Sequence, residues 1–304
     1  MMVKRPLFEV VSDIVTAWNH EFQSTFPLET ADLEQKWVAS PYLLDSSSYA
    51  LVEDGVFVGA IVLKINPFDE QEGHLSFLFV TKQYRNRGIA SSMLDEAIQT
   101  MQALKKRRLT AFGDVDCLFS GVPESPGFYH DFFVNKGFSV SSKHVNLITS
   151  TPPNGSMLPP GFQARVVHNE ATYDALVAFV KTNFSARWAY EVAQAAYEDL
   201  FVLLNATHQV VGFLRMATRK SQNRSNSMNY ATLFPSLAGM GPLGIDPTLR
   251  GKGIGTQFVK LAIQYLFMQG ASHVMVDWTG LISFYQACGF KTIFATFHQY
   301  TRPL

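Results

Sequence analysis

The feature of this sequence that most constrains its fold is an internal repeat. Arg85 and Arg250 each open an Arg-x-x-Gly-x-small segment, and each segment follows a short apolar run after a gap of four residues. Gly88 and Gly253 keep the same offset of 165 positions as the two arginines. Self-similarity at a fixed offset is typical of a duplicated structural unit. The sequence therefore predicts two copies of one domain.

The similarity continues on both sides of the repeated segment. Upstream, Gly59 and Gly212 lie in matching patterns of strand, polar turn and strand, 153 positions apart. Downstream, Gly137 and Gly289 are each followed by phenylalanine and lie 152 positions apart. The unequal offsets predict an insertion in each copy. We place them at residues 219–229 of the second copy and 113–127 of the first, because polar and Gly/Pro-rich turns tolerate insertions.

The boundary between the copies follows from composition. Residues 149–161 are rich in Pro, Gly and Ser, which is typical of a linker. The whole chain has 304 residues, a natural length for two domains of about 150 residues each. We predict a first domain at residues 1–150 and a second at 160–304.

Hydrophobic periodicity predicts an α/β fold of the α+β kind in each copy. Each domain should be a mixed, mostly antiparallel sheet flanked by helices. In the first copy we expect helices at 8–21, 32–38, 89–104 and 128–136, and strands at 49–52, 56–65, 75–80 and 109–112. In the second copy we expect helices at 170–182, 187–198, 254–269 and 281–287, and a strand at 273–277. Pro242 and Pro247 flank a further strand, which proline predicts to be splayed from its neighbour.

The repeated glycine segment has the properties of a phosphate-binding loop. A diphosphate needs several N–H donors from one short loop, and a helix N-terminus adds partial positive charge. Glycine lets the backbone approach the phosphates without an intervening Cβ. An ordinary glycine turn is the alternative, but two loops in matched context favour a ligand site. The glycines fit neither the dinucleotide-binding G-x-G-x-x-G pattern nor a Walker loop.

The order of elements and motifs resembles the GNAT acetyltransferase superfamily. This order is a strand, Arg-x-x-Gly-x-Gly/Ala, a helix, a strand and a short helix ending in Tyr-x-x-x-Gly-Phe. The last motif begins at Tyr285, and the resemblance is strongest over residues 240–290. It implies two tandem GNAT-like domains that bind acetyl-CoA through loop amides and through the ends of the preceding strands. The contacts implied are Phe79, Val80, Arg85, Asn86, Arg87, Gly88, Ile89, Ala90 and Ser91 in the first copy, and Leu243, Ile245, Arg250, Gly251, Lys252, Gly253, Ile254, Gly255 and Thr256 in the second.

Acyl transfer to an amine needs an acid for the leaving thiolate and a neutral attacking amine. Tyr285 occupies the position where similar GNAT enzymes have their tyrosine, and a phenol is protonated at neutral pH. Asp277 closes the strand before this helix and is the candidate base. The alternatives are a packing tyrosine and a solvated or capping carboxylate. The first copy has Phe133 where the second has Tyr285, so the second copy is the expected catalyst.

Composition narrows the class of protein. Lys+Arg and Asp+Glu both number 25, so the basic excess of a nucleic-acid binder is missing. No run of about 20 apolar residues predicts a membrane span, and two cysteines form no metal pattern. We expect a cytoplasmic N-acetyltransferase with acetyl-CoA as substrate, a small amine or peptide as acceptor, and no metal, nucleic-acid or membrane partner. A non-catalytic acyl-CoA-binding module and an aminoacyl donor remain alternatives.

Overall fold

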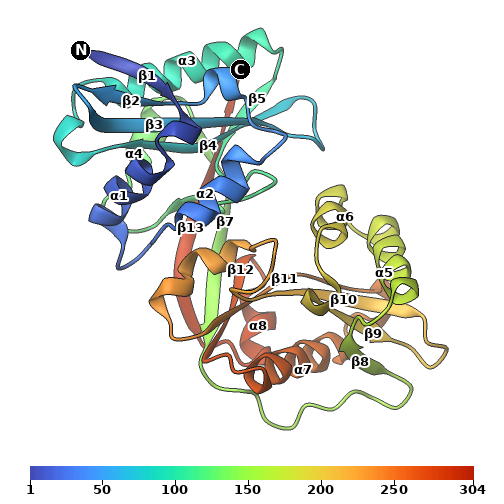
Figure 1. Ribbon diagram of the computed structural model, residues 1–304. Helices are drawn as coiled ribbons and strands as arrows, with labels where there is room; N and C mark the ends of the chain where they lie inside the picture. Colours follow the sequence, from blue (N-terminus) through green and yellow to red (C-terminus); the bar gives the residue numbers. More distant parts are fainter. The chain divides into compact units, whose positions relative to one another are not determined.

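The computed structural model describes residues 1–304, which divide into two compact units. The first unit consists of residues 1–144 together with 296–304, and the second consists of residues 145–295. Each unit is a mixed, mainly antiparallel sheet with helices on both faces, as the sequence predicts (Figure 1). No helix is long and apolar enough to cross a membrane.

The first unit contains a sheet in the order β1-β2-β3-β4-β5-β13. Its elements are β1 Met2–Pro6, α1 Val11–Phe22, α2 Thr30–Leu33, β2 Tyr49–Glu53, β3 Val56–Ile65, β4 Glu72–Val80, α3 Ile89–Ala103, β5 Arg108–Ala111, β6 Val122–Pro123 and α4 His130–Asn135. Helix α1 lies against one face of this sheet and α3 against the other (Figure 1). Ile14, Trp18 and Phe22 of α1 recur at helical spacing and are buried, so they fix the face that α1 turns to the sheet.

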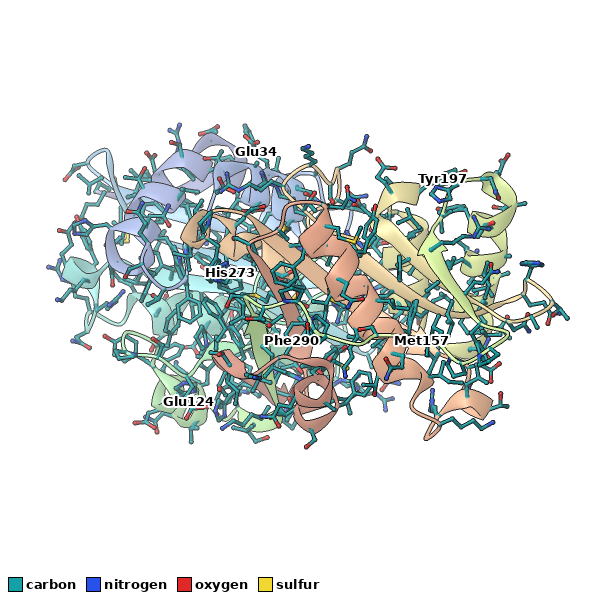
Figure 2. All side chains as sticks on the ribbon, turned by 90° about the horizontal axis from the view of Figure 1, so that it is seen from below. Glu34, Glu124, Met157, Tyr197, His273 and Phe290 are labelled. Atoms are coloured by element: carbon teal, nitrogen blue, oxygen red, sulfur yellow. The ribbon has the colours of Figure 1, made fainter.

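The second unit contains a sheet in the order β7-β12-β11-β10-β9-β8. Its elements are β8 Gln163–Val166, α5 Glu170–Asn183, α6 Ala186–Ala193, β9 Leu200–Leu204, β10 Val210–Ala217, β11 Leu237–Ile245, α7 Ile254–Met268, β12 His273–Thr279 and α8 Ile282–Cys288. Helices α5 and α6 cover one face, and α7 and α8 cover the other (Figure 1). Phe258 and Phe290 lie fully buried in the core under α7 and α8, and Phe290 is labelled in Figure 2.

In each unit, two parallel strands of the sheet separate at the same position of the repeat. The parallel pairing of β4 with β5 ends at Leu75↔Ala111, and that of β11 with β12 ends at Met240↔Val276. Beyond these residues β4 and β11 continue to pair on their other side, with β3 and β10. The register of each of these pairs shifts at that point, which bends the strand away from its parallel neighbour. The structure thus has the splay predicted for β11, and the first unit has it as well.

The last strand of the chain belongs to the first unit. Strand β13, Thr292–Pro303, begins in the second unit, and its end pairs with β5 from Tyr300↔Ala111 to Pro303↔Arg108. Strand β7, Ser139–Thr149, begins in the first unit, and its end pairs with β12. Each copy therefore completes its sheet with a strand end from the other copy. The sequence-based division at residues 150 and 160 places residues 296–304 in the second domain, whereas in the structure they pack with the first.

Both insertions lie where the repeat offsets place them. Residues 218–236 separate β10 from β11 and include the 3-10 helix Asn226–Leu233, and residues 112–129 separate β5 from α4. The helix expected at 187–198 is shorter, because α6 ends at Ala193 and a separate 3-10 helix covers Tyr197–Asp199. The carbonyl of Gln194 accepts a hydrogen bond from the side chain of Asn223. A residue of the insertion thus provides the hydrogen-bond donor for a backbone carbonyl at the end of α6.

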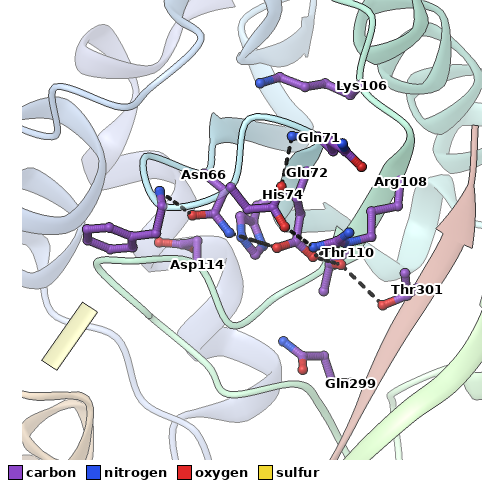
Figure 3. A network of polar contacts seen from close by, with 12 residues as sticks. Asn66, Gln71, Glu72, His74, Lys106, Arg108, Thr110, Asp114, Gln299 and Thr301 are labelled. Carbon is purple, nitrogen blue, oxygen red and sulfur yellow. Dashed lines mark hydrogen bonds and ion pairs between the residues drawn. The ribbon is translucent and has the colours of Figure 1, made fainter. Parts of the chain in front are cut away.

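The insertion of the first unit carries a buried ionic cluster. The ammonium of Lys64 is fully buried and lies 3.0 Å from Asp114 Oδ1 and 2.9 Å from Asp116 Oδ2. Figure 3 shows Asp114 beside the polar network that joins β4, β5 and β13 through Glu72 and Thr110. Burial opposes ionisation of Asp114, but the charges of Lys64 and then His74 outweigh it and lower the pKa of this carboxyl to about 2. The cluster thus ties the insertion to β3 and β4.

The lowered pKa of Asp114 predicts a pH-dependent stability. Because the folded-state pKa lies below the usual 3.8, the stabilisation is complete above pH 4 and is lost as the pH falls through 2. The shift corresponds to about 2 kcal/mol of the free energy of unfolding. Urea unfolding of the chain and of Asp114→Asn between pH 5 and 2 should show a stability difference that shrinks over this window. A difference that is the same at pH 5 and pH 2 would contradict the assignment.

Candidate functional site: two phosphate loops and a splayed sheet

The two predicted phosphate loops have the same backbone conformation. Asn86 and Gly251 adopt left-handed φ values of +61° and +75°, and Gly88 and Gly253 both adopt +76°. Left-handed φ is unstrained only for glycine and is tolerated by asparagine, which explains the residue types at these positions. Gly88 is the N-cap of α3 and Gly253 that of α7. The repeat seen in the sequence is thus also a repeat of conformation.

The outer surface of each loop is open. A Cβ added at Gly88, Gly251 or Gly253 would meet no atom within 4 Å. The first amides of α3 and α7 have no acceptor within their helices, because an α-helix leaves its first N–H groups without intrahelical partners. Both helix starts therefore offer amide donors, partial positive charge and room for an anion.

The side chain of Arg85 holds its own loop in shape. Its Nε donates to the carbonyl of Val80 at 2.8 Å, and its Nη2 donates to Glu21 Oε2 at 2.7 Å. Glu21 of α1 also accepts the backbone amide of Lys82 at 3.2 Å. The backbone amide of Arg85 also donates, to the carbonyl of Lys82 at 3.3 Å, so Arg85 is engaged within its own loop through both its guanidinium and its amide. Arg250 in the second loop is exposed.

This bracing predicts that Glu21 contributes to ligand affinity without touching the ligand. Glu21→Gln keeps the shape but removes the charge, and loosening the first loop should weaken CoA binding there about fivefold, on the order of 1 kcal/mol. Calorimetric titration with CoA, fitted with two sites, measures the change. Glu9→Gln removes the partner of Arg5 on the surface of the same unit and is the matched control. Equal CoA affinities in the two variants would show that the bracing has no effect on binding.

The first unit contains a cavity of about 800 Å³ at its loop and splay. Of the nine residues predicted there, eight line it and Arg87 does not; the eight are Phe79, Val80, Arg85, Asn86, Gly88, Ile89, Ala90 and Ser91. Sequence reasoning missed the aromatic part of the lining, which comes from α1, α4 and the insertion. Trp18, Phe22 and Phe128 belong to this part. The sequence places Trp18 in the helix expected at 8–21, but no local pattern marks its side chain as part of a cavity.

The second loop is built from the same parts. Leu243 and Ile245 lie on β11 beyond the splay, where they pair with β10 only. Lys252 is exposed, whereas Ile254 and Gly255 are buried in the first turn of α7. The side chain of Ile254 packs in the core, which leaves its amide as the group that can face a ligand. Thr256 lies half-buried in the same turn.

Tyr285 lies inside the second unit on α8. Its ring centroid is 5.0 Å from that of Phe284 and 5.7 Å from that of Phe290, and only 6% of the residue is exposed. Burial, followed by the nearby Cys288 and Asp277, raises the pKa of the phenol above its usual 10. Burial also raises the pKa of the Cys288 thiol to about 12, so this cysteine stays protonated and is not a thiolate nucleophile at neutral pH. The phenol is thus a protonated group held rigidly by packing.

Asp277 is the first residue of β12 after the parallel pairing with β11 ends. Its Oδ2 accepts the backbone amide of Ser227, from the insertion, at 2.7 Å. Gly239 of β11 makes this approach possible, since a Cβ there would lie 1.9 Å from Ser227 Oγ. Asp277 therefore lies where the splay begins, and its charge is one of the smaller causes of the raised pKa of Tyr285.

A row of charged and aromatic side chains lies on the α6 face of the same sheet. Arg187 Nε is 2.9 Å from Glu191 Oε1, and the Arg187 guanidinium lies 3.7 Å from the centre of the Trp278 ring. Arg215 of β10 is 6% exposed, and its Nη1 is 4.0 Å from Glu191 Oε2. This arrangement places the charged pair beside the ring of Trp278, the residue that follows Asp277. The sequence carried no local signal that singled out Arg187 or Arg215 for this surface.

Comparisons with known proteins agree with this geometry. The profile of the acetyltransferase (GNAT) family matches residues 11–118 and again residues 169–290. No curated protein matches the chain significantly in sequence.

Several solved structures share the fold over nearly the whole chain. A region described as a GCN5-related glucosamine N-acetyltransferase, within a fungal multi-domain GH3 β-N-acetylglucosaminidase, matches 99% of this chain with a TM-score of 0.85 and 21% identity. The match spans 38% of that larger protein. A tandem GNAT protein from the clavulanic acid biosynthesis pathway has a TM-score of 0.71 and 18% identity, covering 100% of this chain and 98% of its own. A GCN5-related N-acetyltransferase from Sphaerobacter thermophilus has a TM-score of 0.70 and 13% identity, covering 99% and 95%.

The duplicated loop, the two splayed sheets and the two profile matches lead to one assignment. Membership of this family supports acyl transfer in general, with acetyl-CoA as the family's donor. The chain belongs to the acetyltransferase (GNAT) family, as a tandem member with two copies of the domain.

Proposed function

We propose that this chain is an N-acetyltransferase that moves the acetyl group of acetyl-CoA directly to an amine, with chemistry in the second unit. The observation that carries the proposal is the open, left-handed glycine loop beside a splayed strand. The amides at the start of α7 hold the diphosphate, and the free edge of β11 pairs with the pantetheine arm. An edge amide of β11 stabilises the developing oxyanion.

The reaction proceeds without a covalent enzyme intermediate. The neutral amine attacks the thioester carbon, a C–N bond forms and the C–S bond breaks. Tyr285 donates its proton to the departing thiolate, and Asp277 accepts the proton that the new ammonium group loses. The raised pKa of Tyr285 keeps the phenol protonated at neutral pH. The Arg187, Glu191 and Arg215 row orients the acceptor through its polar groups.

A binding experiment followed by a product assay tests this function. Acetyl-CoA at 100 times its dissociation constant should stabilise the unit that binds it by about 2.7 kcal/mol, seen as a rise in melting temperature. Product formation is then followed by release of the CoA thiol with a panel of amines. Glucosamine is the first member, because it is named for the fungal region with the similar fold. No shift with millimolar acetyl-CoA would refute the proposal.

A second candidate function is binding of acyl-CoA without transfer, and one observation favours it for the first unit. Phe133, which is buried on α4, occupies the place of Tyr285 and has no proton to give. Its ring stacks on Tyr300 at 5.4 Å, so the position is filled by packing. Binding of CoA at two sites, with turnover lost only when Tyr285 is changed, would assign binding to the first unit and chemistry to the second.

A further inference from the structure

The cavity of the first unit has two chemically different ends. At one end are the phosphate loop and the start of α3. Lys82 and Asp131 at the rim are exposed to solvent. At the other end the wall consists of aromatic rings from α1 and the insertion. Trp18 lies 5.3 Å from Phe79, and Phe22 lies 4.8 Å from Phe128.

The cavity passes through the sheet at the splay. Gly73 of β4 faces α3, since a Cβ there would collide with Met101 of that helix. Phe77 and Phe79, after the register shift, face α1 and contact Trp18. The cavity is lined both by the start of α3 and by Trp18 of α1, so it connects the two faces. A ligand held at the loop can therefore reach the aromatic end.

The aromatic end offers little to a charged acceptor. The indole N–H of Trp18 donates to the carbonyl of Phe26 at 2.6 Å and is already used. His130 lines the cavity, but its Nε2 lies 3.0 Å from the carbonyl of Pro123 and its Nδ1 lies 2.9 Å from the Tyr300 hydroxyl. Because a carbonyl only accepts, Nε2 carries the proton in the neutral ring and the hydroxyl donates to Nδ1. A buried amine would find no partner there, whereas an apolar chain would lose water-exposed surface.

We infer that the first unit binds a CoA thioester whose acyl chain is apolar and longer than acetyl. The loop holds the diphosphate, and the chain crosses the splay to lie against Trp18, Phe22 and Phe128. The inference rests on the proposed CoA binding and adds the ligand class of the first unit. The α6 face of the second unit also has aromatic rings, those of Phe184, Trp188 and Phe213, but it carries the charged pair of Arg187 and Glu191 as well.

Calorimetric titration with CoA, acetyl-CoA and octanoyl-CoA tests the inference. A buried methylene contributes up to about fourfold in affinity, so burying even two of the six extra methylenes should make octanoyl-CoA at least about tenfold tighter than acetyl-CoA at one site. Phe128→Asn places an amide in the aromatic end and should remove this preference for octanoyl-CoA over acetyl-CoA. Phe128→Leu keeps the wall apolar and should retain the preference.

The outcomes separate this inference from the function on which it rests. If no CoA compound binds, both fail. If acetyl-CoA and octanoyl-CoA bind equally, or if Phe128→Asn leaves the preference intact, the acyl-chain site is refuted and CoA binding stands. Tryptophan fluorescence gives a second test, in a chain with Phe128 unaltered. The site is supported if octanoyl-CoA changes the fluorescence, acetyl-CoA does not, and Trp18→Phe removes the change. Its absence would contradict the site.

Discussion

A chain that ends at Ala295 is expected to lose the folded structure of its first unit. The removed residues supply the strand end that pairs with β5. They also supply Phe297, which is fully buried, and Tyr300, which is 3% exposed. Losing one buried aromatic side chain costs about 3–5 kcal/mol, so losing both approaches or exceeds the stability of a typical domain. Hydrogen exchange should then be fast across β2 to β5, which in the intact chain form the centre of this sheet.

Adding back the missing strand gives the control. A peptide of residues 292–304, supplied in excess, should restore slow exchange in β5 because it can make the same pairing from Tyr300 to Pro303. A matched truncation that removes only Leu304 loses one backbone hydrogen bond, to Arg107, and should change little. If the chain ending at Ala295 kept slow exchange in β4 and β5, the strand end would not be needed for the first unit.

The repeat shows how much of the fold can be predicted from the sequence. The offset shared by Gly88 and Gly253 predicts two strand–loop–helix units, and the structure has both with matching φ values. The splay of β11 could be inferred from Pro242 and Pro247, since proline cannot donate to a sheet ladder. The first copy has no such prolines, so the matching splay of β4 had no local signal. Its cause is a register shift against β3, which depends on tertiary packing.

The exchange of strand ends could not be predicted from local sequence. The patterns of β7 and β13 describe strands, but the same pattern can pair with β5 or with β12. Which partner is chosen depends on contacts far apart in the chain, such as Arg302 Nη1 donating to the carbonyl of Lys136 at 2.6 Å. Composition predicts a linker at residues 149–161, yet residues 145–149, up to and including its first residue, already pair in the second unit. A boundary read from composition therefore marks a polar connection and not the edge of a core.

The candidate site was predictable where it depends on the backbone and not where it depends on side chains. Glycine and helix-start signals located both loops, because left-handed φ restricts residue type. The aromatic wall around Trp18 and the row containing Arg215 come from elements distant in sequence. No local pattern marked either group as part of a site. Which side chains line a cavity is settled by packing.

Replacing Tyr285 by phenylalanine is expected to lower kcat for acetyl transfer by about 10²-fold, because positioned proton transfer contributes at least that much. The ring is buried between Phe284 and Phe290, so phenylalanine keeps its packing and removes only the hydroxyl. Acetyl-CoA affinity should hardly change, since the loop amides before α7 provide the diphosphate contacts. Steady-state rates with the best amine of the panel, and melting shifts with acetyl-CoA, measure the two effects separately.

The matched control for this variant is Tyr265→Phe. Tyr265 lies on α7 in the same unit, and its ring stacks on Phe201 at 5.8 Å, so the exchange also removes a hydroxyl beside the core. Its rate should stay within about twofold of the unaltered chain. The raised pKa of Tyr285 means that its proton is retained as the pH rises to 10, so a fall in rate below that pH should not be caused by its ionisation. Equal turnover by Tyr285→Phe and Tyr265→Phe would remove Tyr285 from the mechanism, and the leaving thiolate would then be protonated by water or another group near Asp277.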